Sequence, residues 1–187
     1  MRIIGGEAKG RTLHFPSRSN QRPTSDFLRE ALFNLLGPLQ NKTFLDLFAG
    51  SGSVGLEAAS RGAQVVCFVE KKKQLVEVIK KNIQTCCLDI KCRVIAGDID
   101  FGLDDLVRKK YEFDIIFADP PYNRELVEAT RKSLSKHQVL RKDGIIVIQH
   151  SIKETFSELA DNIYQTDQRK YGDNALTFLK WSRNDTG

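Results

Sequence analysis

Short, nearly continuous apolar runs recur along this chain, and most are followed by a segment whose apolar residues repeat with a helical spacing. The clearest helical stripe is Leu75, Ile79 and Ile83, which repeats every four residues within an expected helix over 71–84. Strands that are apolar throughout are typical of a parallel sheet covered on both faces. The pattern therefore predicts an α/β doubly wound fold, built from repeated strand-then-helix units.

The expected elements can be placed by residue number. An N-terminal helix is expected over 25–36, where Thr24 and Ser25 offer a cap and Gly37 with Pro38 ends the pattern. Its apolar stripe consists of Leu28, Leu32, Leu35 and Leu36. Parallel strands are expected at 44–48, 64–69, 91–96, 113–118 and 144–149, with helices at 54–61 and 71–84. Two more strands, 162–169 and 175–181, should form an antiparallel pair at the sheet edge.

Charge is concentrated at the start of the chain. The 187 residues, 41% of them hydrophobic, fit one main domain with a full core. Of the net charge of +5, residues 1–25 carry +4, because five bases oppose the single acid Glu7. These bases are Arg2, Lys9, Arg11, Arg18 and Arg22. We expect a small basic arm or hairpin over 1–23 and the main domain over 24–187. Such an arm is typical of a protein that binds a polyanion, although a soluble tail has the same composition.

Several classes of protein are disfavoured by the sequence. It shows no signal peptide and no apolar run near the roughly 20 residues of a membrane helix, so a soluble, cytoplasmic protein is expected. The four cysteines, Cys67, Cys86, Cys87 and Cys92, lack the paired spacing of a zinc site and are expected to be reduced, mostly core residues. The histidines also lack metal or triad spacing, so no metal site is expected.

The stiffest point of the chain is Asp119-Pro120-Pro121-Tyr122, directly after the expected strand 113–118. Two consecutive prolines cannot continue a strand ladder, and they fix their own backbone angles. The carboxylate and the aromatic ring should therefore lie on a rigid turn at the end of a strand. Both a structural turn and an active site fit these four residues on their own.

Further candidate binding residues also follow expected strands. They are Gly50 and Gly52 after the first strand, Glu70 after the second, Asp98 after the third and Asp119 after the fourth. Ligands bind at the carboxyl ends of the strands in an open α/β sheet, so these residues should line one crevice. The glycines allow close backbone approach, and the following helix offers free N–H groups to an anion. Glu70 could accept hydrogen bonds from a ribose, and Asp98, or else Asp100, from an adenine amino group.

The run Gly50-Ser51-Gly52-Ser53-Val54-Gly55 also matches G-x-G-x-x-G, and Glu70 lies near the usual ~20 residues further on. An NAD-dependent oxidoreductase is therefore one alternative. Such enzymes usually need substrate-binding structure beyond the nucleotide domain, for which this chain has little room, and hydride transfer has no use for D-P-P-Y. A non-catalytic RNA-binding module is a second alternative.

In combination, these motifs resemble the RsmD family of bacterial guanine-N2 methyltransferases of small-subunit (16S) ribosomal RNA, which use S-adenosylmethionine. The resemblance covers nearly the whole chain. The N-terminal signature lies in 2–6, 9–11, 22–24 and 29–34, the cofactor motif in 46–52, 55–58 and 60–63, the catalytic motif in 119–122 and the final hairpin in 171–173. D-P-P-Y alone is shared with adenine amino methyltransferases, so an adenine-N6 enzyme acting on DNA or RNA is an alternative.

The resemblance implies a Rossmann-like class I methyltransferase fold and specific roles for residues. Gly50 and Gly52 would pass beneath the methionine part of the cofactor, Glu70 would hold its ribose and Asp98 would contact its adenine. Asp46 would order the loop, bind the cofactor's amino group or be structural. Asp119 and the Pro120 carbonyl would accept hydrogen bonds from the target amino group, while Tyr122 would stack on a flipped or single-stranded base. Arg2, Lys9, Arg11, Arg18 and Arg22 would bind phosphates of ribosomal RNA, free or within an assembled subunit. A monomer without membrane contact is expected.

Overall fold

The computed structural model describes residues 1–15, 25–121, 124–154 and 162–182. The helices of this part are α1 (Asp26–Leu36), α2 (Ser53–Ser60), α3 (Lys73–Cys86), α4 (Ile99–Arg108) and α5 (Arg124–Lys136). Its strands are β1 (Thr43–Leu47), β2 (Val65–Glu70), β3 (Cys92–Ala96), β4 (Phe113–Ala118), β5 (Leu140–Ser151), β6 (Ile163–Tyr171) and β7 (Asn174–Trp181).

All the strands belong to one sheet with the order β3-β2-β1-β4-β5-β7-β6. The first five in this order run parallel, whereas β7 pairs antiparallel with both β5 and β6. The predicted seven-stranded sheet with an antiparallel C-terminal hairpin is therefore confirmed. The order reverses between β1 and β4, because β1 continues outward to β2 and β3 while β4 continues to β5 and the hairpin.

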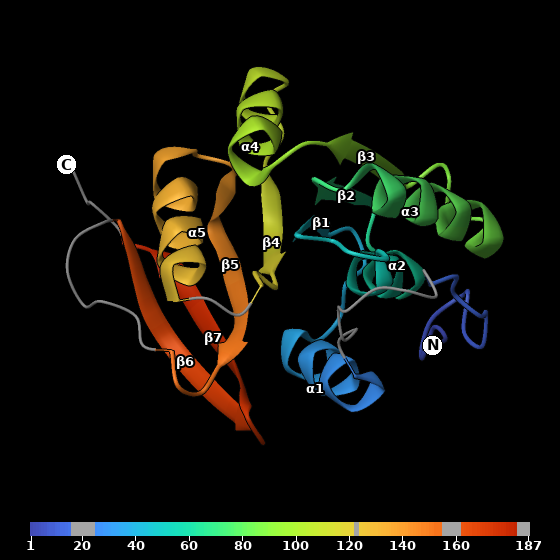
Figure 1. Ribbon diagram of the computed structural model, residues 1–187, viewed down its shortest axis with the longest axis horizontal. Helices are drawn as coiled ribbons and strands as arrows, with labels where there is room; N and C mark the ends of the chain where they lie inside the picture. The colour runs from blue at the N-terminus through green and yellow to red at the C-terminus, as the bar shows by residue number, and fades with distance from the viewer. Residues whose placement is uncertain (16–24, 122–123, 155–161, 183–187) are drawn as a thin grey trace.

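Helices cover both faces of the sheet, as the two hydrophobic clusters show (Figure 1). The first cluster holds residues of α1, α2 and α3, and the second holds residues of α4 and α5. Successive side chains of a strand point to opposite faces. In β4, Ile115 and Phe117 therefore belong to the first cluster, and Ile116 and Ala118 to the second.

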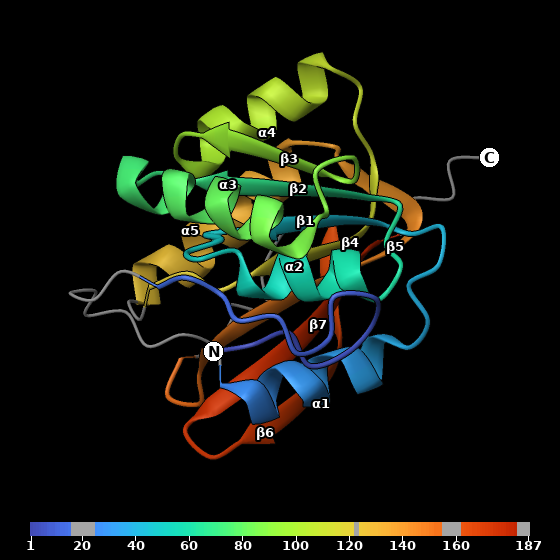
Figure 2. The ribbon, with the colours of Figure 1, turned by 90° about the vertical axis from the view of Figure 1, so that its right-hand side faces the viewer.

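The first fifteen residues run alongside α2 and also contact α1 (Figure 2). Ile3, Ala8 and Leu13 are buried in the first cluster, so this segment is part of the main core. A single antiparallel bridge between Arg2 and Thr12 joins the two arms of this segment, which therefore forms a hairpin. The buried carboxylate of Glu57 in α2 fixes it further, accepting hydrogen bonds from the N–H groups of Ile4 and Gly5 at 2.8 and 2.7 Å. Whether 1–23 acts as a unit distinct from 24–187 stays a prediction.

Most predicted boundaries of the helices and strands hold within two residues. The start of α1 is one example, since the Ser25 hydroxyl caps the helix by accepting a hydrogen bond from the N–H of Leu28 at 3.2 Å. Two predictions differ from the structure. The predicted stripe of α1 is wrong at Leu35, which is 43% exposed, because Phe33 occupies the core instead. Strand β5 is longer than 144–149, since it already pairs with Phe113 at Leu140 and still pairs with β7 at Ser151.

The described residues include no helix that is long and apolar enough to cross a membrane. All four cysteines are free thiols; Cys67 and Cys86 are buried, Cys92 is half-buried and Cys87 is exposed. Burial raises the pKa of both Cys67 and Cys92 to about 12, so neither is a thiolate nucleophile at neutral pH.

Candidate active site

The predicted binding residues emerge side by side where the strand order reverses. Leu47, the last residue of β1, pairs with Val69 on one side and with Ala118 on the other. The residue that follows each of these three paired positions is Phe48 in the loop after β1, Glu70 at the end of β2 and Asp119 after β4. The register thus brings three of the predicted segments to one edge of the sheet.

The glycine loop after β1 turns sharply, with left-handed backbone at Phe48 (φ 57°), Gly50 (φ 58°) and Gly52 (φ 79°). A Cβ atom on Gly52 would lie 3.3 Å from side-chain atoms of Phe68 and Ile79, so packing beneath the loop limits this position to glycine. The space beside Gly50 is open, since the nearest atom to such a Cβ is the Phe48 carbonyl oxygen at 3.9 Å. Gly50 is therefore the loop position that a ligand can approach most closely.

Glu70 ties the glycine loop to the start of α3. One carboxylate oxygen accepts a hydrogen bond from the N–H of Gly50 at 2.9 Å, and the other accepts one from the N–H of Lys72 at 2.8 Å. The side chain is only 6% exposed. Because each carboxylate oxygen has two lone-pair directions, Glu70 can also accept hydrogen bonds from the hydroxyl groups of a ligand.

Asp46 is buried below the loop and accepts a hydrogen bond from the N–H of Gly55 at 2.8 Å. Burial raises the pKa of Asp46 to about 8; the Gly55 hydrogen bond opposes this shift, and the carboxylates of Asp119 and Glu70 add to it. The mutual influence of these three acids places them in one electrostatic site. A ligand that carries positive charge would stabilise all three carboxylates.

The structure separates the two acids that follow β3. Asp98 caps α4, accepting a hydrogen bond from the N–H of Phe101 at 3.1 Å. Asp100 instead accepts a hydrogen bond from the Ser133 hydroxyl at 2.6 Å, which ties α4 to α5. Asp98 is thus the acid that stays at the end of β3. The half-exposed ring of Phe101 lies against Gly97 there, and its aromatic face is a feature that was not predicted from the sequence.

The D-P-P turn begins directly after β4, at the carboxyl edge of the sheet. Asp119 is partly exposed, Pro120 is buried and Pro121 is exposed. Tyr122 lies outside the described residues, so its stacking role stays a prediction.

Three of the five predicted RNA-binding bases lie in the described part, and Arg18 and Arg22 fall outside it. Arg11 donates a hydrogen bond to the carbonyl oxygen of Thr85 near the end of α3, at 2.7 Å. Arg2 is exposed, and its carbonyl oxygen accepts a hydrogen bond from the Arg29 guanidinium at 2.8 Å.

Lys9 and Arg11 lie toward the edge of the sheet opposite to Asp119. The N–H of Glu7 donates to the carbonyl oxygen of Ser60 at 2.8 Å, and Ser60 ends α2. Helix α2 leaves the carboxyl end of β1 and returns to the start of β2, so its last residue is at the far edge. RNA contacts by these bases stay a prediction, but they would be distant from the D-P-P turn.

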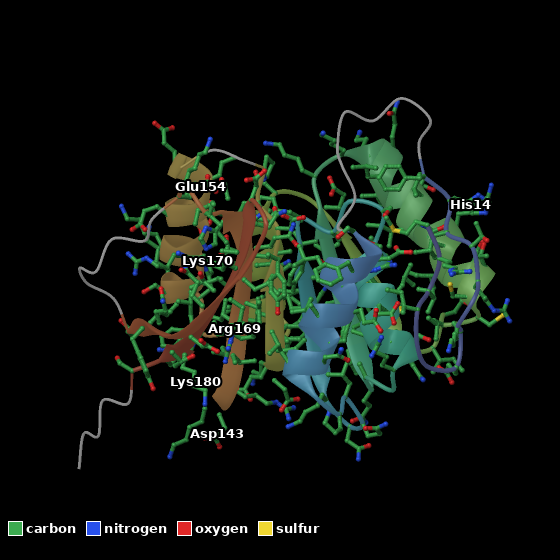
Figure 3. All side chains as sticks on the ribbon, turned by 90° about the horizontal axis from the view of Figure 1, so that it is seen from below. His14, Asp143, Glu154, Arg169, Lys170 and Lys180 are labelled. Atoms are coloured by element: carbon green, nitrogen blue, oxygen red, sulfur yellow. The ribbon has the colours of Figure 1, made fainter. Side chains whose placement is uncertain are left out.

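Asn82 on α3 is a linking residue that was not predicted from the sequence. It is fully buried; its carbonyl oxygen accepts a hydrogen bond from the N–H of His14 at 2.7 Å, and its amide donates to the carbonyl oxygens of Ser51 and His14 at 3.0 and 3.1 Å. It therefore joins the N-terminal segment to the glycine loop. The available signal was a polar residue among the buried positions of α3. His14 lies beside α3, on the opposite side of the molecule from Arg169 and Lys170 of β6 (Figure 3).

Across the ranges that the structure describes, no group of three or more His, Cys, Asp or Glu residues could hold a metal ion. Asp46 and Glu70 each accept a hydrogen bond from a backbone N–H group, that of Gly55 and that of Gly50.

Known proteins agree with this description. The family described as Conserved hypothetical protein 95 matches residues 1–180. Ribosomal RNA small subunit methyltransferase D of Escherichia coli strain K12 is 35% identical over 154 residues, which are 82% of this chain and 76% of the relative. The structure of hypothetical protein TTHA0928 of Thermus thermophilus matches with a TM-score of 0.81 and 35% identity, over 96% of this chain and 99% of that one.

A more distant structure shows the fold alone. The methyltransferase SMU.776, solved in complex with SAH, matches with a TM-score of 0.64 and 19% identity over 82% of this chain and 48% of that one. The predicted Rossmann-like methyltransferase fold is therefore confirmed. Because the family match covers nearly the whole chain and the E. coli relative shares more than a third of the aligned residues, this chain belongs to the RsmD family.

Proposed function

We propose that this protein transfers a methyl group from S-adenosylmethionine to the exocyclic N2 of a specific guanine in 16S ribosomal RNA. The observation that carries the proposal is the position of Asp119, which shares one electrostatic site with Asp46 and Glu70 where the strand order reverses. In a chain of the RsmD family, Asp119 at this point would supply an acceptor for an amino group beside the edge of the sheet where nucleotides bind.

The crevice fits the cofactor. Bound S-adenosylmethionine supplies a methyl group on a positively charged sulfonium. Asp46, Glu70 and Asp119 lie close enough to interact, and a cation beside them would counter the effect that raises the pKa of Asp46. Gly50 and Gly52 would hold the methionine part, and Glu70 would accept hydrogen bonds from the ribose while it keeps the loop in place. Asp98 would accept one from the adenine amino group. Asp46 would keep the loop ordered through Gly55.

On the substrate side, Asp119 and the Pro120 carbonyl would accept the two hydrogens of the target amino group. The lone pair of such a nitrogen is normally delocalised into the ring. Two acceptors that draw the hydrogens out of the ring plane free this pair for attack, so the turn works by alignment rather than by strong acid–base chemistry. Tyr122 would stack on the base, which must leave any duplex to enter.

The basic residues would hold the RNA. Because Lys9 and Arg11 lie toward the far edge of the sheet, an RNA that reaches both them and Asp119 must extend across α2 and α3. This distance favours a folded or subunit-bound RNA over a short single strand. Arg2, Arg18 and Arg22 complete the proposed set.

The test is to treat ribosomal RNA and small subunits from a strain that lacks the activity with enzyme and S-adenosylmethionine. Mass spectrometry then identifies the modified nucleoside and its position. We expect N2-methylguanosine, and comparison of the two substrates shows which of them is used. N6-methyladenosine would establish an adenine-N6 enzyme instead.

A thermal-shift assay tests for an oxidoreductase and for a non-catalytic RNA-binding module. We expect S-adenosylhomocysteine to raise the unfolding temperature and NAD to leave it unchanged. A shift with NAD alone would favour the oxidoreductase, and no shift with either ligand would favour the RNA-binding module.

A further inference from the structure

A buried carbonyl oxygen lies beside the D-P-P turn. Gln149 is only 4% exposed, and its side-chain oxygen Oε1 has no hydrogen-bond partner in the described structure. A buried acceptor without a donor destabilises a protein, so such groups need a specific explanation. One common explanation is a ligand that supplies the missing donor.

The register places Gln149 next to Asp119. Ala118 of β4 pairs with Ile148 of β5, and the next residue on each strand is Asp119 and Gln149. Within β5, Gln149 continues the alternation of Val147, which belongs to the first cluster. Asp119 directly follows β4, two residues after Phe117 of the same cluster. Asp119 also acts on the pKa of Asp46, which shares the first-cluster face of β1 with Phe44, whereas Leu45 faces the second cluster. The Gln149 amide and the Asp119 carboxylate thus belong to the same side of neighbouring strands, which lie about 4.8 Å apart.

The remaining buried polar atoms without partners lie elsewhere. Two of them are side-chain nitrogens of Arg29 in α1. The third nitrogen of the same guanidinium donates hydrogen bonds to Asp26 and to the Arg2 carbonyl oxygen. The other is the indole nitrogen of Trp181, a residue at the opposite end of β7, where the strand pairs with β6 at Ile163. Of these atoms in the described ranges, only Gln149 Oε1 is at the carboxyl edge beside Asp119.

Gln149 is also on the substrate side of Asp119. The cofactor residues proposed above follow β1, β2 and β3, on one side of β4 in the sheet order, whereas β5 and β7 lie on the other. A base whose amino group meets Asp119 therefore extends toward β5. Gln149 is a polar side chain that β5 presents on this side of Asp119.

We propose that Gln149 Oε1 accepts the N1–H of the target guanine and so selects guanine over adenine. This inference rests on the proposed function. In guanine, N1–H stands directly beside the N2 amino group, so neighbouring acceptors on β4 and β5 match neighbouring donors on the base. In adenine, the ring nitrogen beside the amino group is a lone-pair acceptor and meets the Gln149 carbonyl with repulsion. The base enters with its N1 edge toward β5.

The test uses 2-aminopurine, which keeps the 2-amino group but lacks both the N1–H and the O6 carbonyl of guanine, so the Gln149 variants assign any preference to N1–H. RNA substrates carry guanine or 2-aminopurine at the position identified by mass spectrometry. We compare kcat/KM for the two substrates with wild type, Gln149→Met and Gln149→Glu. Methionine removes the acceptor at similar size, and glutamate keeps a carbonyl or carboxylate acceptor.

We expect wild type to prefer guanine by about 10- to 100-fold, the range of one directed hydrogen bond to a base. Gln149→Met should lose most of this preference, and Gln149→Glu should retain it. An equal preference in wild type and Gln149→Met overturns the inference, as does a wild type with no preference or a Glu variant that has lost it. If the Met variant does not fold, a wild type with no preference or a Glu variant that has lost it still overturns the inference. Failure of the proposed function is distinguishable, because then neither RNA acquires a methyl group at N2.

Discussion

The carboxylate of Glu70 accepts a hydrogen bond from the N–H of Gly50 at 2.9 Å, across 20 residues of sequence. The residue proposed to hold the ribose therefore also holds the loop proposed to pass beneath the methionine part. Two binding contributions depend on one side chain, so its loss should weaken both.

Replacing Glu70 with alanine should raise the dissociation constant for S-adenosylhomocysteine by about 10- to 100-fold, since a hydrogen bond to a charged group is worth about 1.5–3 kcal/mol. Isothermal titration calorimetry measures this constant. Glu77→Ala, on the exposed face of α3, is the matched control and should bind normally. Equal affinity of both variants would contradict the role of Glu70.

Gly50→Ala should fold and yet bind the cofactor poorly. The added Cβ meets no atom closer than 3.9 Å, but it occupies the open side of the loop. Gly172→Ala is a close control, because Gly172 has nearly the same φ of 59° and nothing within 4 Å, in the β6–β7 turn. Both variants should lose about 1 kcal/mol of stability from left-handed strain. Only Gly50→Ala should lose affinity for S-adenosylhomocysteine. An equal loss of affinity in Gly172→Ala would mean that backbone strain alone, and not contact with the ligand, weakens binding.

Asp119→Ala should retain cofactor binding and lose methyl transfer. The amino group loses the acceptor that orients it, and misalignment of reacting groups reduces rates by about 100-fold or more. Single-turnover transfer of labelled methyl to small subunits measures the rate, and a thermal shift with S-adenosylhomocysteine confirms binding. Undiminished turnover would refute the assigned mechanism.

The raised pKa of Asp46 predicts a pH-dependent stability. The pKa is about 8 in the folded protein against an ordinary 3.8, so the folded chain holds this proton more tightly than the unfolded chain. The resulting stability is full below the ordinary pKa and is lost as the pH rises toward about 8. Asp46→Asn cannot ionise and keeps an acceptor for the Gly55 N–H.

The free energy of unfolding of Asp46→Asn, relative to wild type, should therefore increase from about pH 5 to about pH 8 and then level off. Urea titrations of the ligand-free proteins measure it. Asp89→Asn, an exposed change, should show no such trend. A constant difference across this range would mean that Asp46 is ionised throughout.

The sheet and its binding edge were predictable because burial on both faces leaves apolar runs such as 113–118. Because these strands run parallel, the residue that follows each strand lies at the same edge of the sheet, the edge of their carboxyl ends. Helices α4 and α5 were not predicted. In α5 the apolar Val127 and Leu134 lie among many polar residues, and Thr130 and Arg131 share its buried face.

The side-chain contacts within the candidate site could not be predicted from the sequence. The contacts of Asn82 with His14 span 68 residues, and the unpaired oxygen of Gln149 depends on side-chain packing rather than on spacing. Sequence spacing finds residues that follow strands. It does not find a polar side chain that the core has left without a partner.

The buried amide of Asn82 also sets an order of events during synthesis. The segment ending at His14 emerges from the ribosome before Glu57 and Asn82, the residues that fix it. It must therefore wait, unfixed, until α3 has been translated. Because the same amide donates to the Ser51 carbonyl oxygen, a nascent chain that ends before Asn82 also lacks this hydrogen bond to the glycine loop.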